Sequence, residues 1–116
     1  MIQGNDPDGT RNLDFEVHVD IDSYIDYLIV NHFIGNTDWS RNNFRMGKRR
    51  VDSTGFKFFS WDAETSLDLK SSLNRTTLTT NKVTDGDGVA GPDSSLRANP
   101  EFRLRFADRI HQHFFN

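Results

Sequence analysis

The fold is decided by residues 20–43, which read DIDSYIDYLIVNHFIGNTDWSRNN. Large apolar side chains in its first half recur every three or four residues, which is the period of one face of an α-helix. They are Ile21, Tyr24, Ile25, Leu28, Ile29 and Phe33. The spacing predicts a core helix over 22–34, with Asp20 or Asp22 at its first turn and Gly35 at its end. The polar residues 36–43 then predict a loop that directly follows a buried helix. Upstream, residues 1–18 are expected to form an irregular arm.

A β-hairpin is predicted after this loop, with strands at 43–50 and 56–61. The second strand is rich in aromatic residues, which favour strands. Residues 52–55, Asp-Ser-Thr-Gly, supply the turn between the two strands. The second strand leads directly into Asp62. We interpret Trp39 and Trp61 as packing residues, and Trp61 as a shield against water beside Asp62.

The last part of the chain is predicted to contain a long polar loop and a closing helix. Residues 65–95 are rich in Ser, Thr, Asn, Asp and Gly and show little periodicity. A helix is predicted over 100–115, because Asn99 can cap it and Pro100 suits its first position. Apolar residues recur every fourth position in this helix. They are Phe102, Phe106, Ile110 and Phe114. The predicted fold class is α+β, with a core helix, a β-hairpin and a C-terminal helix in one partial domain spanning 1–116.

Composition excludes several classes of protein. The chain has 116 residues, no cysteine and a net charge of −3, so disulfides and thiolate metal sites are excluded. Residues 1–38 carry eight acids and one base, whereas 39–58 carry six bases and one acid. The chain therefore lacks the overall basic character of a nucleic-acid binder. No apolar run approaches the roughly 20 residues that a membrane span needs. We expect neither a nucleic-acid partner nor a membrane partner.

Three polar residues are candidates for a common site: Asp38, Asn43 and Asp62. Asp38 lies in the loop after the core helix, Asn43 follows it by five residues, and Asp62 ends the aromatic strand. Because a hairpin brings the ends of its two strands together, the three are expected to converge. A protein-kinase catalytic loop has this Asp-to-Asn interval and a second Asp after a short hairpin. There the first Asp accepts a proton, and the other two residues hold magnesium on the nucleotide.

Three stretches of the chain, in order, resemble the spore coat protein CotH family of atypical protein kinases. The first joins 19–27 to 36–43 and resembles the core helix and catalytic loop of that family. The second is 56–64, an aromatic strand that ends in Trp-Asp, and the third is the helix at 99–109. The resemblance implies a fold similar to the C-terminal lobe of a protein kinase. It also implies transfer of phosphate from ATP to Ser residues of a protein substrate, in spore coat, secreted or cell-surface proteins.

The resemblance implies a role for each candidate residue. Asp38 would be the catalytic Asp, and Asn43 and Asp62 would hold Mg²⁺ with ATP. The chain departs from the kinase pattern because no His-Arg precedes Asp38 and because Asp-Ala-Glu replaces Asp-Phe-Gly at 62–64. Residues 1–37 contain no lysine, and no glycine-rich loop is present, so the nucleotide-gripping lobe is missing. We therefore expect the catalytic half of a longer kinase, inactive alone, with ATP and Mg²⁺ bound in the full-length parent.

Other interpretations of the same residues remain open. In a non-catalytic domain of the spore coat or cell exterior, the acids would hold a structural cation or a partner. In a metal-dependent hydrolase, Asp38 and Asp62 would act together, although the lack of clustered histidines disfavours zinc. The stretch 85–88, Asp-Gly-Asp-Gly, resembles a calcium loop but lacks the remaining ligands. His32, at the end of the core helix, is interpreted as a cap or a surface group.

Overall fold

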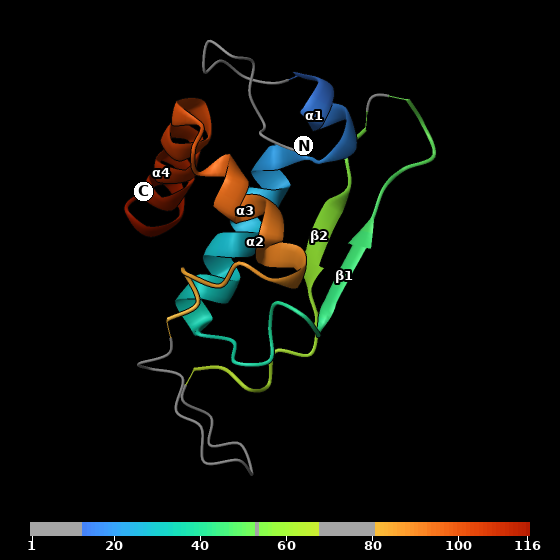
Figure 1. Ribbon diagram of the computed structural model, residues 1–116. Coiled ribbons are helices and arrows are strands. Elements are labelled where there is room, and N and C mark those ends of the chain that lie inside the picture. Colours follow the sequence, from blue (N-terminus) through green and yellow to red (C-terminus); the bar gives the residue numbers. More distant parts are fainter. Residues whose placement is uncertain (1–12, 53, 68–80) are drawn as a thin grey trace.

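The computed structural model describes residues 13–52, 54–67 and 81–116. Figure 1 shows one central helix with a two-stranded sheet on one side and a C-terminal helix on the other. The helices are α1 (Leu13–His18), α2 (Ile21–Ile34), α3 (Gly91–Leu96) and α4 (Pro100–Phe114), and the short 3₁₀ helix η1 spans Gly88–Ala90. The strands are β1 (Phe44–Gly47) and β2 (Lys57–Ser60). The predicted α+β class is therefore confirmed.

The central helix α2 matches the predicted core helix. Asp20 is its N-cap, because its side chain accepts a hydrogen bond from the Ser23 N–H at 3.0 Å. Gly35 ends the helix in the left-handed conformation, with φ of 58°. Tyr24, Ile25 and Leu28 are completely buried. The expected irregular arm is wrong for residues 13–18, which form α1, while residues 1–12 lie outside the described part.

The hairpin packs one face against α2. Its strands are antiparallel, with Phe44 opposite Ser60 and Met46 opposite Phe58, and both are shorter than predicted. The Phe58 ring lies between the rings of Tyr24 and Tyr27, at centroid distances of 5.0 and 5.6 Å. The opposite face is exposed to solvent, and Phe59 on that face is 53% exposed. The hairpin therefore depends on α2 for its stability, as isolated two-stranded sheets are marginal in water.

Part of the predicted polar loop is helical and belongs to the core. Residues 88–96 form η1 and α3, and they bury Val89, Ala90 and Leu96. The Tyr24 hydroxyl donates a hydrogen bond to the Val89 carbonyl at 2.8 Å. The expectation of a loop over the whole of 65–95 is therefore wrong at its C-terminal end. Its middle, 68–80, lies outside the described residues.

The C-terminal helix α4 matches its predicted bounds within one residue. The Asn99 side chain caps it, accepting hydrogen bonds from the Glu101 and Phe102 N–H groups at 2.7 and 3.2 Å. Phe102 is buried against the core, and Phe106 and Ile110 pack at its edge. None of the helices in the described ranges is long and apolar enough to cross a membrane.

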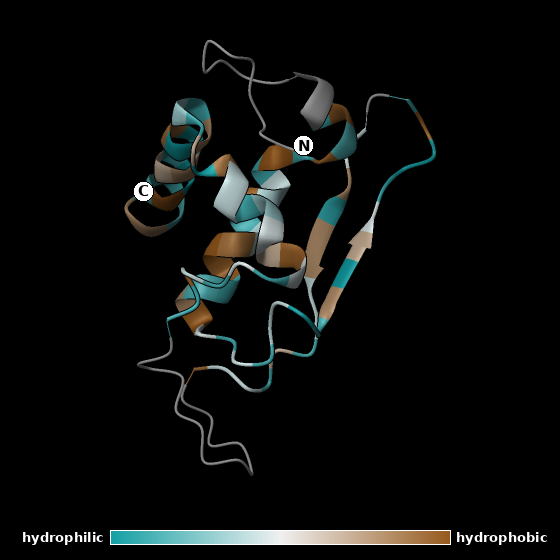
Figure 2. Ribbon diagram, viewed as in Figure 1, coloured by the Kyte–Doolittle hydropathy of each residue, from teal (hydrophilic) through white to brown (hydrophobic). Residues whose placement is uncertain are grey.

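Hydropathy differs between the two ends of the molecule. Figure 2 shows brown or tan segments on α2 and β2, alternating with teal ones, whereas the loop between α2 and β1 is mostly white or teal. Buried apolar side chains thus hold the body of the domain. The candidate residues lie in the polar loops at one end of it.

Candidate catalytic loop and metal site

The candidate loop begins with a buried asparagine immediately after α2. Asn36 has no exposed surface, and its side-chain amide donates to the Asn31 side-chain oxygen at 3.2 Å. Its own side-chain oxygen accepts a hydrogen bond from the Asp38 N–H at 3.2 Å. A buried amide that loses its partners is costly, so this network fixes the path of the chain. Asn36 therefore positions the backbone of Asp38.

Asn43 joins the other two candidate residues. Its side-chain nitrogen donates to the Asp38 carboxylate at 3.0 Å and to the backbone carbonyl of Asp62 at 3.2 Å. Both Asn43 and Asp62 have φ of 55°, a left-handed conformation that Asn and Asp tolerate better than most residues. The structure thus brings Asn43 to the carboxylate of Asp38 and to the main chain of Asp62. The Asp38 residue is half-buried, while Asp62 is exposed.

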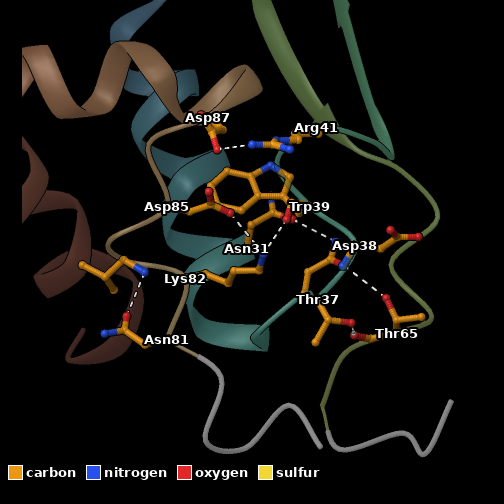
Figure 3. A network of polar contacts seen from close by, with 12 residues as sticks. Asn31, Thr37, Asp38, Trp39, Arg41, Thr65, Asn81, Lys82, Asp85 and Asp87 are labelled. Atoms are coloured by element: carbon orange, nitrogen blue, oxygen red, sulfur yellow. Dashed lines mark hydrogen bonds and ion pairs between the residues drawn. The ribbon is translucent and has the colours of Figure 1, made fainter. Parts of the chain in front are cut away.

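The segment after Asp62 runs beside the loop that carries Asp38. The Thr65 carbonyl accepts hydrogen bonds from the Thr37 N–H at 3.2 Å and the Thr37 hydroxyl at 3.1 Å. The Leu67 N–H donates to the Ile34 carbonyl at 3.0 Å. Figure 3 shows Thr37 and Thr65 facing one another beside Asp38. These bonds hold the two loops side by side, so Asp38 and Asp62 have a shared support.

The two tryptophans have different environments. Trp39 is 2% exposed, and its indole N–H donates to the Tyr27 hydroxyl at 2.6 Å. Burial raises the pKa of Tyr27 to about 12, although the bond from Trp39 opposes the shift. Trp61 is 52% exposed, and the Arg45 guanidinium lies 4.6 Å from its ring centre. The packing interpretation is correct for Trp39 and wrong for Trp61, because β2 has a covering helix on one face only.

A small polar pocket of about 250 Å³ adjoins Asp38. Its lining includes Lys82, Asp85 and Asp87, of which the sequence singled out only the two acids, as part of a calcium-like stretch. Lys82 donates to the Trp39 carbonyl at 2.5 Å and pairs with Asp85 at 3.1 Å. Arg41 pairs with Asp87 at 2.5 Å. The two acids of the calcium-like stretch, Asp85 and Asp87, are therefore paired with the side chains of Lys82 and Arg41. No local pattern in the sequence indicates the role of Lys82, because it contacts a residue 43 positions away.

His32 is a packed residue rather than a cap or a surface group. Its ring lies 5.6 Å from the Trp39 ring and 6.4 Å from the Phe106 ring. Its Nε2 atom is buried and has no hydrogen-bond partner among the described residues. Burial lowers the pKa of His32 because it disfavours the charged imidazolium. The expectation for this residue is wrong because α4 covers the end of α2.

The donor chemistry of the candidate site suits a hard cation such as Mg²⁺, which prefers oxygen ligands. The set comprises the carboxylates of Asp38 and Asp62 and the side-chain oxygen of Asn43. Because Asn43 uses its nitrogen for both hydrogen bonds, its oxygen remains for a ligand. Within the described ranges, no three His, Cys, Asp or Glu side chains group closely enough to hold a metal. Two acids with one amide can meet the needs of Mg²⁺ if phosphate and water supply the other ligands.

Comparison with known proteins assigns the family. The family model described as CotH kinase protein matches residues 4–114, which is nearly the whole chain. No curated protein and no solved structure matches the chain. The match includes the core helix, the loop with Asp38, the hairpin and the C-terminal helix. The chain therefore belongs to the CotH kinase family.

Proposed function

We propose that this chain is the catalytic half of a CotH-like protein kinase that transfers phosphate from ATP to Ser residues of a protein. The observation that carries the proposal is the bridge made by Asn43. One side-chain amide binds both the Asp38 carboxylate and the Asp62 carbonyl, at 3.0 and 3.2 Å. The kinase reaction needs a proton acceptor and metal-binding residues in one place. The bridge supports such a grouping.

Asp38 is the proposed catalytic residue. Its carboxylate accepts the proton of the attacking Ser hydroxyl as that oxygen bonds to phosphorus and the ADP oxygen leaves. A general base must lie within hydrogen-bond reach of the proton that it accepts. The bond from Asn43 occupies one oxygen of the Asp38 carboxylate and leaves the other to accept the proton. Half-burial of Asp38 restricts its motion further.

Asn43 and Asp62 are the proposed metal-binding residues, through the Asn43 side-chain oxygen and the Asp62 carboxylate. Bound Mg²⁺ neutralises the charge that develops on the phosphate oxygens. The exposure of Asp62 leaves room for a nucleotide phosphate beside it. Asn43 then has two functions, since its nitrogen orients Asp38 and its oxygen holds the metal. Replacement by Asp at 43 would remove the first function and keep the second.

The proposal includes a nucleotide-binding lobe supplied from outside these residues. Residues 1–37 contain no lysine that could grip ATP phosphates. Phosphoryl transfer depends mainly on positioning and charge stabilisation, so half of the apparatus gives little activity. We expect the 116-residue chain alone to transfer no phosphate. In this proposal the described domain corresponds to the C-terminal lobe of a kinase-like fold, and the protein acts in the spore coat, at the cell surface or as a secreted enzyme.

The test compares three variants in the longest natural protein that contains this chain. Asp38→Asn and Asp62→Asn are expected to reduce phosphate transfer from ATP to a Ser-containing protein by about 10²-fold or more. Each is expected to change the free energy of unfolding by less than about 1 kcal/mol, because both groups lie in partly exposed loops. Asp108→Asn, on the exposed side of α4, is the matched control and should keep full transfer.

Each variant tests one role. Full transfer by Asp62→Asn rejects the metal assignment, and unfolding of Asp38→Asn makes that residue structural. Autophosphorylation by the isolated chain that disappears in Asp62→Ala would show that no further lobe is needed. Absence of transfer in the natural protein, with retained cation binding at Asp62, would favour the non-catalytic binding domain.

A further inference from the structure

Residues 82–90, which we call the clamp, lie against the outside of the loop that carries Asp38. The clamp meets the loop at three successive residues. Lys82 binds the Trp39 carbonyl, Val89 donates its N–H to the Ser40 carbonyl at 3.1 Å, and Asp87 pairs with Arg41. Figure 3 shows Lys82, Asp85 and Asp87 on the same side of the loop, facing Trp39 and Arg41. The clamp thus fixes the backbone immediately after Asp38.

Lys82 is the unusual member of the clamp. Its side chain is only 14% exposed, and its ammonium group donates to the Trp39 carbonyl at 2.5 Å and to Asp85 at 3.1 Å. Lys57, by comparison, is 57% exposed and pairs with Asp20 at 3.2 Å. A buried charge is costly unless it is paired and hydrogen-bonded. Asp85 supplies the paired charge for Lys82. Because the ammonium group of Lys82 is charged, its bond to the Trp39 carbonyl is charge-assisted and stronger than a neutral hydrogen bond.

The far end of the clamp is fixed to the core. Gly88 has φ of 55°, and a Cβ atom there would lie 2.4 Å from the Ser40 carbonyl oxygen. No side chain fits that approach, so glycine allows the two backbones to touch. Val89 and Ala90 are buried, and the Tyr24 hydroxyl binds the Val89 carbonyl. The clamp therefore transmits the position of the central helix to the loop.

We propose that Lys82 is a positioning residue for Asp38, an inference that rests on the proposed kinase function. Asp38 and the residue after it have three supports: Asn36 accepts from the Asp38 N–H, Asn43 donates to the Asp38 carboxylate, and Lys82 donates to the Trp39 carbonyl. Without Lys82 the third support is lost, because the Trp39 carbonyl no longer has its charged hydrogen-bond donor. A displacement of about 1 Å in a catalytic group can reduce the rate about 10²-fold. Lys82 itself touches neither substrate nor metal in this proposal.

The test uses Lys82→Met, which keeps most of the side-chain volume and removes the charge, and Lys82→Arg, which keeps the donor. Lys57→Met is the matched control, because it also removes a lysine paired with one aspartate. In the natural protein, Lys82→Met is expected to lower kcat by at least about tenfold and to change KM for ATP by less than about twofold. Lys82→Arg should recover most of kcat. Lys57→Met should match the wild type.

A second readout needs no kinase activity. Amide hydrogen exchange at Asp38 and Val89 is expected to be at least about tenfold faster in Lys82→Met. The Asp38 amide bonds to Asn36 in the loop that the clamp contacts, and the Val89 amide bonds from the clamp to Ser40 of that loop. The amide of Tyr24 in α2, which donates to the Asp20 carbonyl, should not change. If Lys82→Met does not fold, Asp85→Asn replaces it, with a smaller increase at the same two amides and a lower kcat.

The outcomes separate the two proposals. Unchanged exchange and unchanged kcat in Lys82→Met, or in Asp85→Asn as its replacement, overturn the clamp and leave the kinase proposal standing. Equal exchange in Lys82→Met and Lys57→Met also overturns it. Faster exchange in a protein whose wild type transfers no phosphate supports the clamp on the loop but rejects the proposed function.

Discussion

The two ends of the domain are held by different forces. On the helical side, α2 and α4 meet through buried apolar side chains, with Leu28 fully buried and Phe102 3% exposed. On the loop side, Asn36, Asn43 and Lys82 hold the chain with hydrogen bonds, and Lys82 also pairs with Asp85. Apolar burial is non-directional, whereas a polar network needs every partner in place. The difference teaches that the body of this domain supplies stability, while its loops supply position.

Ion pairs on the helical side do not alter this comparison. Arg109 and His113 of α4 bind the Asp26 carboxylate on α2, and Arg105 binds Glu16 and Asp22. Burial alone would raise the pKa of Asp26, but the bonds from Arg109 and His113 outweigh it and lower the pKa. Such partly exposed pairs contribute little each. They join α4 to α1 and α2 beside the apolar contact.

The largest expected loss of stability comes from a substitution on the helical side. Phe102→Ala is expected to lower the free energy of unfolding by about 3–5 kcal/mol, because it leaves a cavity between α4 and the core. Phe115→Ala is the control, since that ring is 73% exposed, and it should change stability by about 0.5 kcal/mol or less. Urea denaturation of both variants gives the two values. Equal stabilities would mean that α4 does not pack as described.

A smaller loss of stability is expected from a substitution on the loop side. Asn36→Ala is expected to cost about 1–3 kcal/mol, because the Asn31 side-chain oxygen and the Asp38 N–H lose their buried partner. Asn42→Ala, at an exposed position of the same loop, is the control. Urea denaturation and phosphate transfer are measured on both. If loops supply position, transfer by the folded Asn36→Ala protein falls far more than transfer by Asn42→Ala, and equal rates would contradict the comparison.

The smallest expected effect is at the border of the two regions, where His32 contacts both Trp39 and Phe106. The pKa of His32 is lowered from 6.5 by burial, so below pH 6.5 the unfolded chain binds a proton that the folded chain does not. Stability contributed by neutral His32 is therefore complete above that pH and is lost as pH falls toward the lowered pKa. Unfolding midpoints between pH 7 and 5 should fall more in the wild type than in His32→Leu.

His111→Gln is the control for this prediction, because His111 is exposed on α4. It should follow the wild-type pH profile. A His32→Leu profile as steep as that of the wild type would show that other groups cause the pH dependence.

The sequence alone was sufficient for the elements whose signals are local. The three- and four-residue spacing from Ile21 to Phe33 and the caps at Asp20 and Asn99 describe α2 and α4 closely. These features are local because helix period and caps depend on residues within one or two turns. Spacing also singled out Asp38, Asn43 and Asp62, and the structure adds the bonds of Asn43. Their catalytic and metal-binding roles remain predictions.

Only the tertiary structure decided what covers each surface. The sequence did not predict the helices at 88–96, because Val89 and Leu96 are apolar positions without periodic neighbours. Both are buried in the core, and Val89 bonds to Tyr24 of α2. Trp61 was taken for a packed residue, yet it is 52% exposed and contacts the Arg45 guanidinium. Lys82 meets the loop 43 residues upstream. Local sequence patterns do not predict such contacts, because the contacts form only after distant segments have been brought together.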